Sequence, residues 1–399
     1  MSYFSTSPTF VTDSATPEAF SPTDKSATRV FLVRHGHTTY NEQERYQGNS
    51  DYSVLTDQGE QNAFATGLAL QQFNFDAIYT SPLTRAQQTV QSMVSAWEQT
   101  QPNPAPILIE PKLTEICLED WQGLTYKVVK AKFPEAHRCW SDTPHLFSCD
   151  GINFPVVDLF QAAEQFWQSI LARHRGQTIL IVAHGGTNRA LISTAIGVEA
   201  EHYHSLQQSN CGISCLEFAN GNRSEVELSY LNVTNHLQEK LPKLKAEKTG
   251  WRWLFISNSV TEDLLASSRL PGLMAQNFVN LIVTDYSQAS ENIAETLLQN
   301  NQQTIHLAVA QSGFLETWQR RISNQQKSNS ASETASLTTG LIIADDKLLH
   351  DILNKTLGVN ATLNTLKHLS IVHYPHANCQ SILQGIIPLE STSIALPKL

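Results

Sequence analysis

The sequence predicts an α/β fold, with a mostly parallel sheet and helices on both faces. From Val30 onward, short apolar runs typical of buried strands alternate with stretches of helical periodicity. This alternation is typical of parallel sheets, because each strand is followed by a helix that packs on a face of the sheet. A second observation is that the order of elements starts again after residue 250, which predicts a duplicated fold.

The first half of the chain contains the clearer set of elements. Strands are expected at the short apolar runs, which are VFLV at 30, AIYT at 77, ILI at 107 and TILIVA at 178. Helices are expected between these runs, beginning near Thr56 and near Leu83, spanning 155–174, and running from about Thr187 to Ile196. The runs CGISCLEF and EVELSYL are then predicted to form a closing hairpin around residues 219–222.

Composition divides the chain into four segments. Residues 1–27 are rich in Ser, Thr and Pro with almost no apolar periodicity, so we expect a disordered tail. Residues 28–238 form the first module, and the charged, Pro-containing segment 239–250 suits a linker. Residues 251–399 form the second module, in which GLIIADDKLLHDILNKTLG at 340 matches ILIVAHGGTNRALISTAIG at 179. The other interpretation is that any two α/β segments look alike; duplication is favoured over it.

Charge and composition exclude several classes of protein. With 27 Lys+Arg against 37 Asp+Glu, the formal charge of -10 has the wrong sign for nucleic-acid binding, and a phosphate ligand would need a locally basic pocket. The sequence contains no run of about 18 apolar residues and begins without the pattern of an export signal, so we expect a cytoplasmic protein without a membrane partner. The six cysteines lack metal-binding spacing and are expected to be free thiols, and no metal or cofactor is predicted.

The segment LVRHGHTTYN at 32 places Arg34 and His35 at the end of the first strand. Ligands of open α/β sheets bind at this edge. A neutral imidazole can attack phosphorus and hold the phosphoryl group covalently, and an adjacent guanidinium can bind the phosphoryl oxygens in bidentate fashion. An RHG tripeptide alone is a weak signal, since chance or a surface turn explains most such matches.

Two further segments repeat this strand-to-helix arrangement, YTSPLTRAQQT at 79 and AHGGTNRAL at 183. Arg85 lies in the first turn of a helix, where a cation opposes the helix dipole and is better explained as an anion ligand. His184 precedes Gly185 and Gly186, whose backbone amides could point at a bound anion. Taken singly, a solvated arginine and a core histidine are the ordinary interpretations; the repeated pattern favours a phosphate site.

Together these segments, in this order and spacing, resemble the histidine phosphatase superfamily, in particular its phosphoglycerate-mutase-like branch. The resemblance covers about 28–235 and includes LTEICLEDWQGLTY at 113 as the acid segment of that family. Other stretches, such as HRCWSDTPHLF at 137, are similar to two-module members of photosynthetic bacteria, often labelled carboxyarabinitol-1-phosphate phosphatase-like. By position, the resemblance implies His35 as nucleophile, Glu115 as general acid, His184 as a further catalytic phosphate ligand, and Arg34, Arg85, Asn41 and Gly185 as phosphate-binding residues.

The resemblance implies a phosphomonoesterase that hydrolyses a small phosphate ester, a sugar phosphate or phospho-acid, through a phosphohistidine. Two arginines and a histidine can stabilise the transition state without a metal, while a carboxylic acid protonates the leaving alkoxide. Glu115 is favoured as that acid over Glu119 and Asp120. A phosphoglycerate mutase would need more basic residues over a second substrate group, and 125–150 has no paired arginines. The mutase and a non-catalytic phospho-ligand-binding or regulatory protein are the alternatives.

The second module has lost the residues on which this chemistry depends. Arg34 and His35 correspond to Ser257 and Asn258, His184 corresponds to Asp345, and Arg85 falls near Ala289. A pocket without both arginines and with an added carboxylate would repel phosphate. We therefore expect an inactive copy that serves as a packing partner or binding surface, and assembly of the chain into a homodimer is left open.

Overall fold

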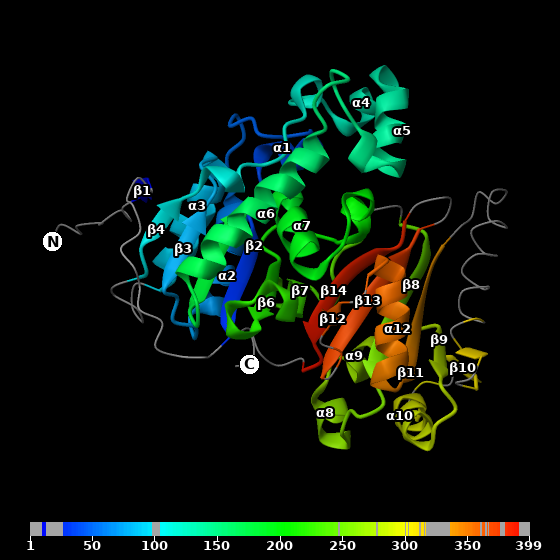
Figure 1. The fold of residues 1–399 in the computed structure, drawn as a ribbon. Helices are drawn as coiled ribbons and strands as arrows, with labels where there is room; N and C mark the ends of the chain where they lie inside the picture. The colour runs from blue at the N-terminus through cyan, green and yellow to red at the C-terminus, as the bar shows by residue number, and fades with distance from the viewer. Residues whose placement is uncertain are drawn as a thin grey trace.

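One continuous sheet runs through both halves of the chain and is covered by helices on both faces (Figure 1). The computed structural model describes residues 10–12, 27–97, 104–245, 248–276, 278–299, 301, 303–310, 313–314, 316, 336–359, 361–363, 365, 367–375 and 380–390. The predicted α/β class with a mostly parallel sheet is confirmed. None of the helices in these ranges is both long enough and apolar enough to cross a membrane.

The strands of the first half stand in the order β1-β4-β3-β5-β2-β6-β7. β2 is central, parallel to β5 and antiparallel to β6, and its residues 30–33 are fully buried because helices cover both faces. The predicted strands and the closing β6–β7 hairpin are confirmed. The bounds are Phe10–Thr12 (β1), Thr28–Arg34 (β2), Ala77–Thr80 (β3), Ile107–Ile109 (β4), Thr178–Ala183 (β5), Ile213–Phe218 (β6) and Val226–Val233 (β7).

The helices of the first half begin close to the predicted residues. Thr56 caps the helix that follows it, where its hydroxyl accepts a hydrogen bond from the Gly59 amide at 3.1 Å. The helix predicted from Thr187 begins two residues earlier, at Gly185, because the Glu115 carboxylate accepts a hydrogen bond from the Gly186 amide in its first turn. The bounds are Thr39–Glu42 (α1), Asp57–Leu70 (α2), Thr84–Ser95 (α3), Tyr126–Lys132 (α4), Pro134–Asp142 (α5), Pro155–Arg173 (α6) and Gly185–Ile196 (α7).

The second half repeats the sheet in reverse order, β14-β13-β8-β11-β9-β10. β8 is parallel to β11 and antiparallel to β13, as β2 is to β5 and β6. The two halves meet where β7 pairs with β14, at Leu231 and Ile386. The bounds are Gly250–Ser257 (β8), Leu281–Thr284 (β9), Ile305–Ala308 (β10), Leu337–Ala344 (β11), Thr362–Leu363 (β12), His368–Tyr374 (β13), Ile382–Pro388 (β14), Glu262–Ser267 (α8), Leu270–Ala275 (α9), Gln288–Leu298 (α10) and Asp346–Leu357 (α12).

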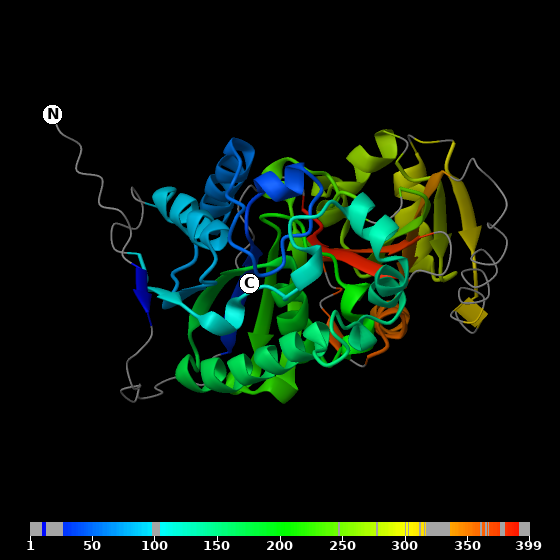
Figure 2. The ribbon, with the colours of Figure 1, turned by 90° about the horizontal axis from the view of Figure 1, so that it is seen from above.

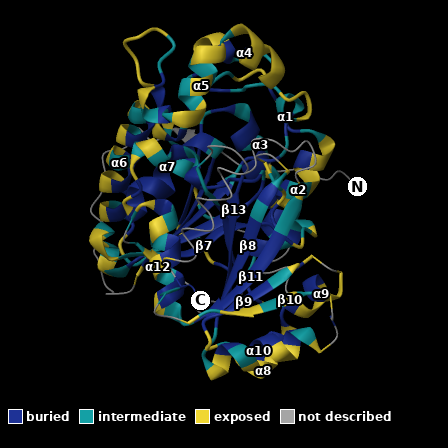
Figure 3. Cartoon of the chain, turned by 90° about the vertical axis from the view of Figure 1, so that its right-hand side faces the viewer, coloured by how far each residue is buried: buried dark blue, intermediate teal, exposed yellow. Residues whose placement is uncertain are grey.

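Two apolar cores lie on the two faces of the sheet and extend through both halves (Figure 3). Phe31 packs in one core with Met93 of α3, whereas its neighbour Leu32 packs in the other with Phe166 of α6. The second half contributes Ile293 of α10 to the first core and residues of α12 to the other. The halves therefore share their hydrophobic layers as well as their sheet. Seen from above, the two halves lie side by side (Figure 2).

Two boundary predictions need correction. The tail prediction for 1–27 is wrong at Phe10–Thr12, because β1 pairs with β4 at the edge of the sheet; residues 1–9 and 13–26 lie outside the described ranges. The linker predicted at 239–250 is not free chain throughout. Leu241 and Pro242 are buried, and Gly250 is already the first residue of β8.

Candidate active site

The carboxyl ends of the central strands and the first turns of α3 and α7 meet at a cavity of about 390 Å³. This volume suits a small metabolite. Six of the predicted site residues line it, namely Arg34, His35, Asn41, Arg85, Glu115 and Gly185. The seventh, His184, packs against His35 with 5.2 Å between the ring centroids.

His35 is held in one tautomer by the backbone. Its Nδ1 lies 2.8 Å from the Gly36 carbonyl oxygen, which can only accept a hydrogen bond, so Nδ1 carries the proton and Nε2 the lone pair. The residue is 2% exposed, and its burial, together with the charges of Arg34 and Arg85, holds the pKa of His35 well below its usual value. The imidazole is therefore neutral and nucleophilic at neutral pH.

His184 is oriented by Ser81, which the sequence reasoning did not single out. The Ser81 hydroxyl accepts from the Leu83 amide at 3.2 Å and lies 2.7 Å from His184 Nε2. When this hydroxyl donates to Nε2, the proton of the neutral ring is on Nδ1, which is buried without a hydrogen-bond partner. An unpartnered buried donor is costly, so Nδ1–H is a donor suited to a ligand oxygen.

Arg34 and Arg85 are fixed by backbone carbonyls. Arg34 donates to Gln208 O at 2.9 Å, and Arg85 donates to Ser50 O and Gly48 O, each at 2.7 Å. The Nε atoms of both arginines are buried without a partner. Burial lowers the pKa of Arg85 to about 10, so the guanidinium keeps its charge at neutral pH.

Glu115 binds the start of α7. Its Oε2 accepts from the Gly186 amide at 3.0 Å, while Oε1 accepts from the amides of Ile116 and Thr187 at 2.9 and 3.1 Å. These amides fix the position and orientation of the carboxyl group at the start of α7. The expectation that both glycine amides bind a substrate anion is thus wrong for Gly186, because Glu115 occupies it. Oε2 keeps a lone pair for a proton.

The two alternatives to Glu115 as the acid are not at the cavity. Glu119 and Asp120 lie in a short 3-10 helix, and both are exposed. Neither is among the described residues that line the cavity with His35. The geometry therefore favours Glu115.

Asn41 contacts the His35 loop through Asn210, which the sequence did not indicate. The Asn41 amide oxygen accepts from the Thr38 amide at 3.2 Å and from Asn210 Nδ2 at 3.1 Å. Asn210 also donates to the carbonyl oxygens of His35 and Gly36. With its oxygen engaged, Asn41 has its amide N–H groups left to offer a ligand.

Comparison with known proteins identifies the family of the chain. Residues 30–231 match the family model of the histidine phosphatase superfamily (branch 1). The chain belongs to the histidine phosphatase superfamily. It is 41% identical over 215 residues to the probable 2-carboxy-D-arabinitol-1-phosphatase of Arabidopsis thaliana, over 53% of this chain and 43% of that protein.

Two other relatives of this histidine phosphatase are similar over the same half. The 2-carboxy-D-arabinitol-1-phosphatase of Triticum aestivum is 36% identical over 239 residues, which is 59% of this chain and 47% of the wheat protein. Phosphoserine phosphatase 1 of Hydrogenobacter thermophilus is 29% identical over 211 residues, which is 53% of this chain and 95% of that protein. The chain thus spans less than half the length of the two plant relatives it matches.

The histidine phosphatase cavity contains more positive charge than the sequence reasoning found. Among its described lining residues, Glu115 is the one carboxylate, whereas the cations are Arg34, Arg45, Arg85, Arg189 and Lys245. A basic pocket therefore exists despite the formal charge of -10. The sequence could have indicated Arg189, because it lies four residues after Gly185 and so on the same face of the helix as that predicted site residue. Lys245 had none, because it belongs to the predicted linker.

These cations weaken one argument from the sequence. The absence of paired arginines in 125–150 favoured hydrolysis over mutase action, but Arg189 and Lys245 supply basic residues from other segments. That absence consequently does not separate the two reactions.

No group of three or more metal-binding side chains occurs in the part of the chain that the structure describes, and all five cysteines described there are free.

The corresponding strand ends of the second half contain different side chains. Asn258 follows β8 as His35 follows β2. The backbone amide of Asn258 donates to the Ala344 carbonyl at 2.8 Å, and the backbone amide of His35 likewise donates to the Ala183 carbonyl at 2.9 Å. Asp285 stands directly after β9, as Ser81 does after β3. Its carboxylate accepts from the Ser287 hydroxyl at 2.6 Å and from the Asp345 amide at 3.1 Å.

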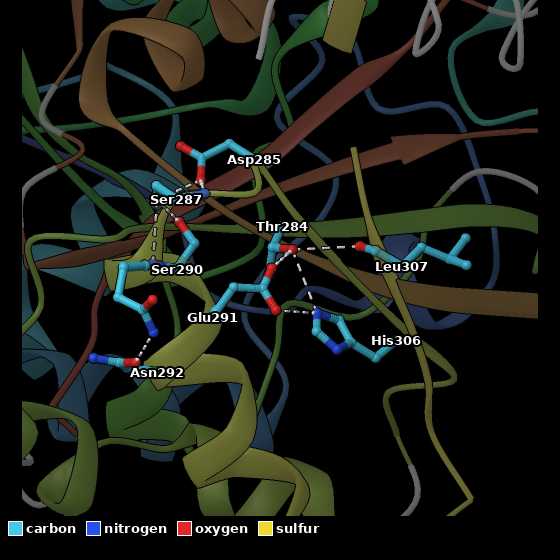
Figure 4. Close-up of polar contacts among 9 residues, drawn as sticks. Thr284, Asp285, Ser287, Ser290, Glu291, Asn292, His306 and Leu307 are labelled. Atoms are coloured by element: carbon cyan, nitrogen blue, oxygen red, sulfur yellow. Dashed lines mark hydrogen bonds and ion pairs between the residues drawn. The ribbon is translucent and has the colours of Figure 1, made fainter. Parts of the chain in front are cut away.

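Asp285 is 5% exposed and turned toward the start of α10 (Figure 4). The Asp285 carboxylate thus already accepts hydrogen bonds from the Ser287 hydroxyl and the Asp345 amide, which a bound anion would otherwise need. Ala289, at the second position of α10, stands where Arg85 stands in α3. The second site has an anion in place and lacks the arginine that would bind another.

Proposed function

We propose that this chain is a phosphomonoesterase that hydrolyses a small phosphorylated metabolite through a phosphohistidine at His35. The observation that carries the proposal is the state of the His35 ring. Its Nδ1–H is committed to the Gly36 carbonyl, so an unprotonated Nε2 lies within a cavity lined by guanidinium groups. A neutral nucleophile surrounded by cations is the requirement for attack on a phosphate ester.

In the first step, His35 Nε2 attacks phosphorus, and a P–N bond forms as the bond from phosphorus to the ester oxygen breaks. Arg34, Arg85 and the Nδ1–H of His184 stabilise the charge on the phosphoryl oxygens. Glu115 gives the proton on Oε2 to the leaving alkoxide. In the second step, water attacks phosphorus, Glu115 takes a proton from that water, and a P–O bond forms as the P–N bond breaks, which returns the lone pair to His35 Nε2 and releases phosphate.

Asn41 and Gly185 complete the phosphate site in this proposal. The amide N–H groups of Asn41 are its remaining donors, because its oxygen is engaged. At Gly185, an added Cβ would lie 3.2 Å from Arg34 Nε, so the missing side chain lets the arginine lie against the start of α7. Both residues line the cavity.

The names of the relatives support a small phosphate ester as substrate. Two are 2-carboxy-D-arabinitol-1-phosphatases and one is a phosphoserine phosphatase. The substrates in these names carry a carboxylate as well as a phosphate. We therefore place a phospho-acid ahead of a simple sugar phosphate for this chain.

We also propose that residues 28–238 form the catalytic module and that 251–399 form a degenerate, inactive duplicate. The reversed strand order, the equivalent amide bonds of His35 and Asn258, and the glycine caps of α7 and α12 support duplication. Gly197 and Gly358 both adopt left-handed φ values, of 82° and 70°. The buried carboxylate of Asp285 supports inactivity, because it would repel a phosphate.

The finer parts of the proposal are a cytoplasmic, metal-independent enzyme without nucleic-acid or membrane partners. The free thiols of the described cysteines support a reducing compartment, and the cationic cavity supports catalysis without a metal. A homodimer stays a prediction. The second module occupies the β7 edge, through β14, where another chain could otherwise pair.

The direct test is trapping of the phosphorylated intermediate. Acid quench of the full chain with a labelled phosphate ester should leave label on His35, and His35→Ala should abolish both label and turnover. A mutase would instead transfer phosphate to a second hydroxyl acid and depend on a bisphosphorylated primer. A non-catalytic binder would bind phosphate esters with no hydrolysis of any of them, an outcome that would refute the proposal.

A further inference from the structure

The segment between the two modules is held in place on both sides. The Pro242 carbonyl accepts from Arg252 of β8 at 3.0 Å, and the Lys243 carbonyl accepts from Gln207 of the first module at 2.9 Å. Leu241 and Pro242 are buried. The position of the next described residues, up to Lys245, therefore depends on contacts with both modules.

A chain of buried side chains joins these two contacts. Arg252 Nε donates to Gln384 Oε1 at 3.0 Å, and Gln384 Nε2 donates to Gln207 Oε1, also at 3.0 Å. Gln384 and Gln207 are 1% and 3% exposed. Because every member is buried and bonded, this polar network specifies one arrangement of the interface.

The network ends at the active site. Gln207 precedes Gln208, whose carbonyl oxygen accepts from Arg34 at 2.9 Å and from the Lys245 ammonium. Two residues later, Asn210 donates to the His35 carbonyl at 3.0 Å. The loop at 207–210 thus connects the second module with the nucleophile, with Arg34 and with Lys245.

Lys245 brings an excess of positive charge into the cavity. Its ammonium donates to the Gln208 carbonyl and lies beside Arg34 and Arg189 in the cavity lining. Burial, together with these two guanidinium groups, holds the pKa of Lys245 well below its usual value, so an anionic ligand group would stabilise the charged ammonium. The Glu115 carboxylate is bound by the amides of α7. Like charges gathered on one wall of the cavity suit an anionic group of a ligand.

Arg189 is positioned for the same ligand group. Its Nε donates to the Leu206 carbonyl at 2.8 Å, and its guanidinium lies over the Tyr203 ring, 5.4 Å from the centroid. Arg189 lines the cavity together with Lys245. The phosphoryl group would already engage Arg34 and Arg85, so Arg189 and Lys245 are left for a second charge on the substrate.

We propose that Lys245 and Arg189 form a subsite for a second anionic group of the substrate, and that the second module positions Lys245 through Arg252, Gln384 and Gln207. This rests on the proposed phosphatase function, whose substrate it narrows to a phosphate ester that carries another anion. Arg252, Gln384 and Gln207 are positioning residues. The degenerate module then acts as part of the specificity apparatus of the active one.

The test compares two ligands that differ in one group, 3-phosphoglycerate with its carboxylate and glycerol 3-phosphate with a hydroxymethyl group. Binding is measured to the full chain carrying His35→Ala, so that turnover is not needed, and hydrolysis is measured with His35 intact. Lys245→Met should weaken 3-phosphoglycerate binding about tenfold or more and leave glycerol 3-phosphate nearly unchanged. Lys243→Met is the matched control, because that side chain is 82% exposed and pairs with Glu239.

Gln384→Leu tests the positioning role. We expect the same loss of preference for 3-phosphoglycerate, seen in KM rather than kcat, while any change in kcat that the two ligands share reports the contacts of the 207–210 loop with Arg34 and His35. Thermal unfolding identifies a variant that has lost its fold, and Arg252→Lys then repeats the test by a milder change. Equal losses for both ligands in Lys245→Met, or an equal effect of Lys243→Met, would overturn the subsite.

Two further outcomes separate this inference from the proposed function. Binding of 3-phosphoglycerate that depends on Lys245, without turnover of any phosphate ester, would support the subsite and refute the proposed phosphatase function. A bisphosphate that binds more tightly than 3-phosphoglycerate, again in a Lys245-dependent way, would support the subsite and assign the second anion as a phosphate. Turnover with no preference for a second anion would overturn the subsite alone.

Discussion

Gly186→Ala is the substitution whose effect on catalysis the structure defines most sharply. A Cβ added at Gly186 would lie 2.4 Å from Glu115 Oε1 and 2.4 Å from the Tyr203 hydroxyl. Ordinary contact begins at 3.4 Å, so the carboxyl group must move by about 1 Å. That movement would disturb the hydrogen bond from the Gly186 amide to Oε2, the oxygen proposed to hold the catalytic proton.

A displacement of this size in a positioned catalytic group costs about 10²-fold in rate, or roughly 2.7 kcal/mol of transition-state stabilisation. The loss should depend on the leaving group, because an alkoxide needs the proton and a nitrophenolate needs it far less. We expect kcat to fall about 10²-fold for alkyl phosphates and only a few-fold for p-nitrophenyl phosphate. Steady-state kinetics with both substrates measure the ratio.

Two glycine variants serve as controls. Gly272→Ala, where a Cβ would meet nothing within 4 Å, should leave both rates unchanged. In Gly185→Ala, the added Cβ would lie 3.2 Å from Arg34 Nε, so it would meet Arg34 rather than Glu115. This variant should raise KM for both substrates without altering the ratio of their kcat values. Equal loss of the two substrates in Gly186→Ala, with the fold intact by circular dichroism, would refute the role of Glu115 as leaving-group acid.

Ser81→Ala removes the donor to His184 Nε2 and should lower kcat/KM about tenfold, because the tautomer that presents Nδ1–H is no longer fixed; an unchanged kcat/KM would contradict this. Since burial and the charges of Arg34 and Arg85 hold the pKa of His35 well below its usual value, lowering the pH through 6.5 should not protonate the nucleophile. The acidic limb of kcat/KM that reports His35 should therefore lie below pH 6.5, and a His35-dependent limb at that value would count against the buried neutral imidazole. Treatment with EDTA should leave turnover within about twofold, because guanidinium groups and His184 replace a metal in stabilising the charge; strong metal dependence would contradict the mechanism. Asp285→Asn in the second module should leave kcat unchanged but destabilise the fold by about 1–3 kcal/mol, measured by denaturant unfolding, because buried donors lose an acceptor.

The local pattern of the sequence was sufficient for the elements and for most of the site. Strand and helix periodicity depends on neighbouring residues, so β2, β5 and α3 could be predicted from short windows. Parallel strands end at one edge, which is why Arg34, His35 and His184 could be expected to meet. The acid was harder to choose, and Glu115 was favoured over Glu119 and Asp120 only through the family resemblance.

The reversed pairing of the two sheets was not predictable from periodicity. Nothing local in Leu231 or Ile386 indicates that β7 and β14 pair, because that contact joins residues more than 150 positions apart. The three-residue β1 was likewise missed, since its partner β4 lies almost a hundred residues away and its own segment lacks apolar periodicity. Long-range pairing of this kind is decided by the packing of the whole sheet.

The amino-acid sequence by itself determined the alternation of strands and helices, and it was sufficient to predict that Arg34, His35 and Arg85 share one site and that Ser257 and Asn258 stand at the corresponding strand end of the second half. Only the tertiary structure decided that the Gly186 amide binds Glu115, that Ser81 orients His184, and that Lys245 reaches the cavity. The physical reason is that helical and strand preferences are local. Hydrogen bonds and charge pairs between distant segments exist only once the two apolar layers have packed on the shared sheet.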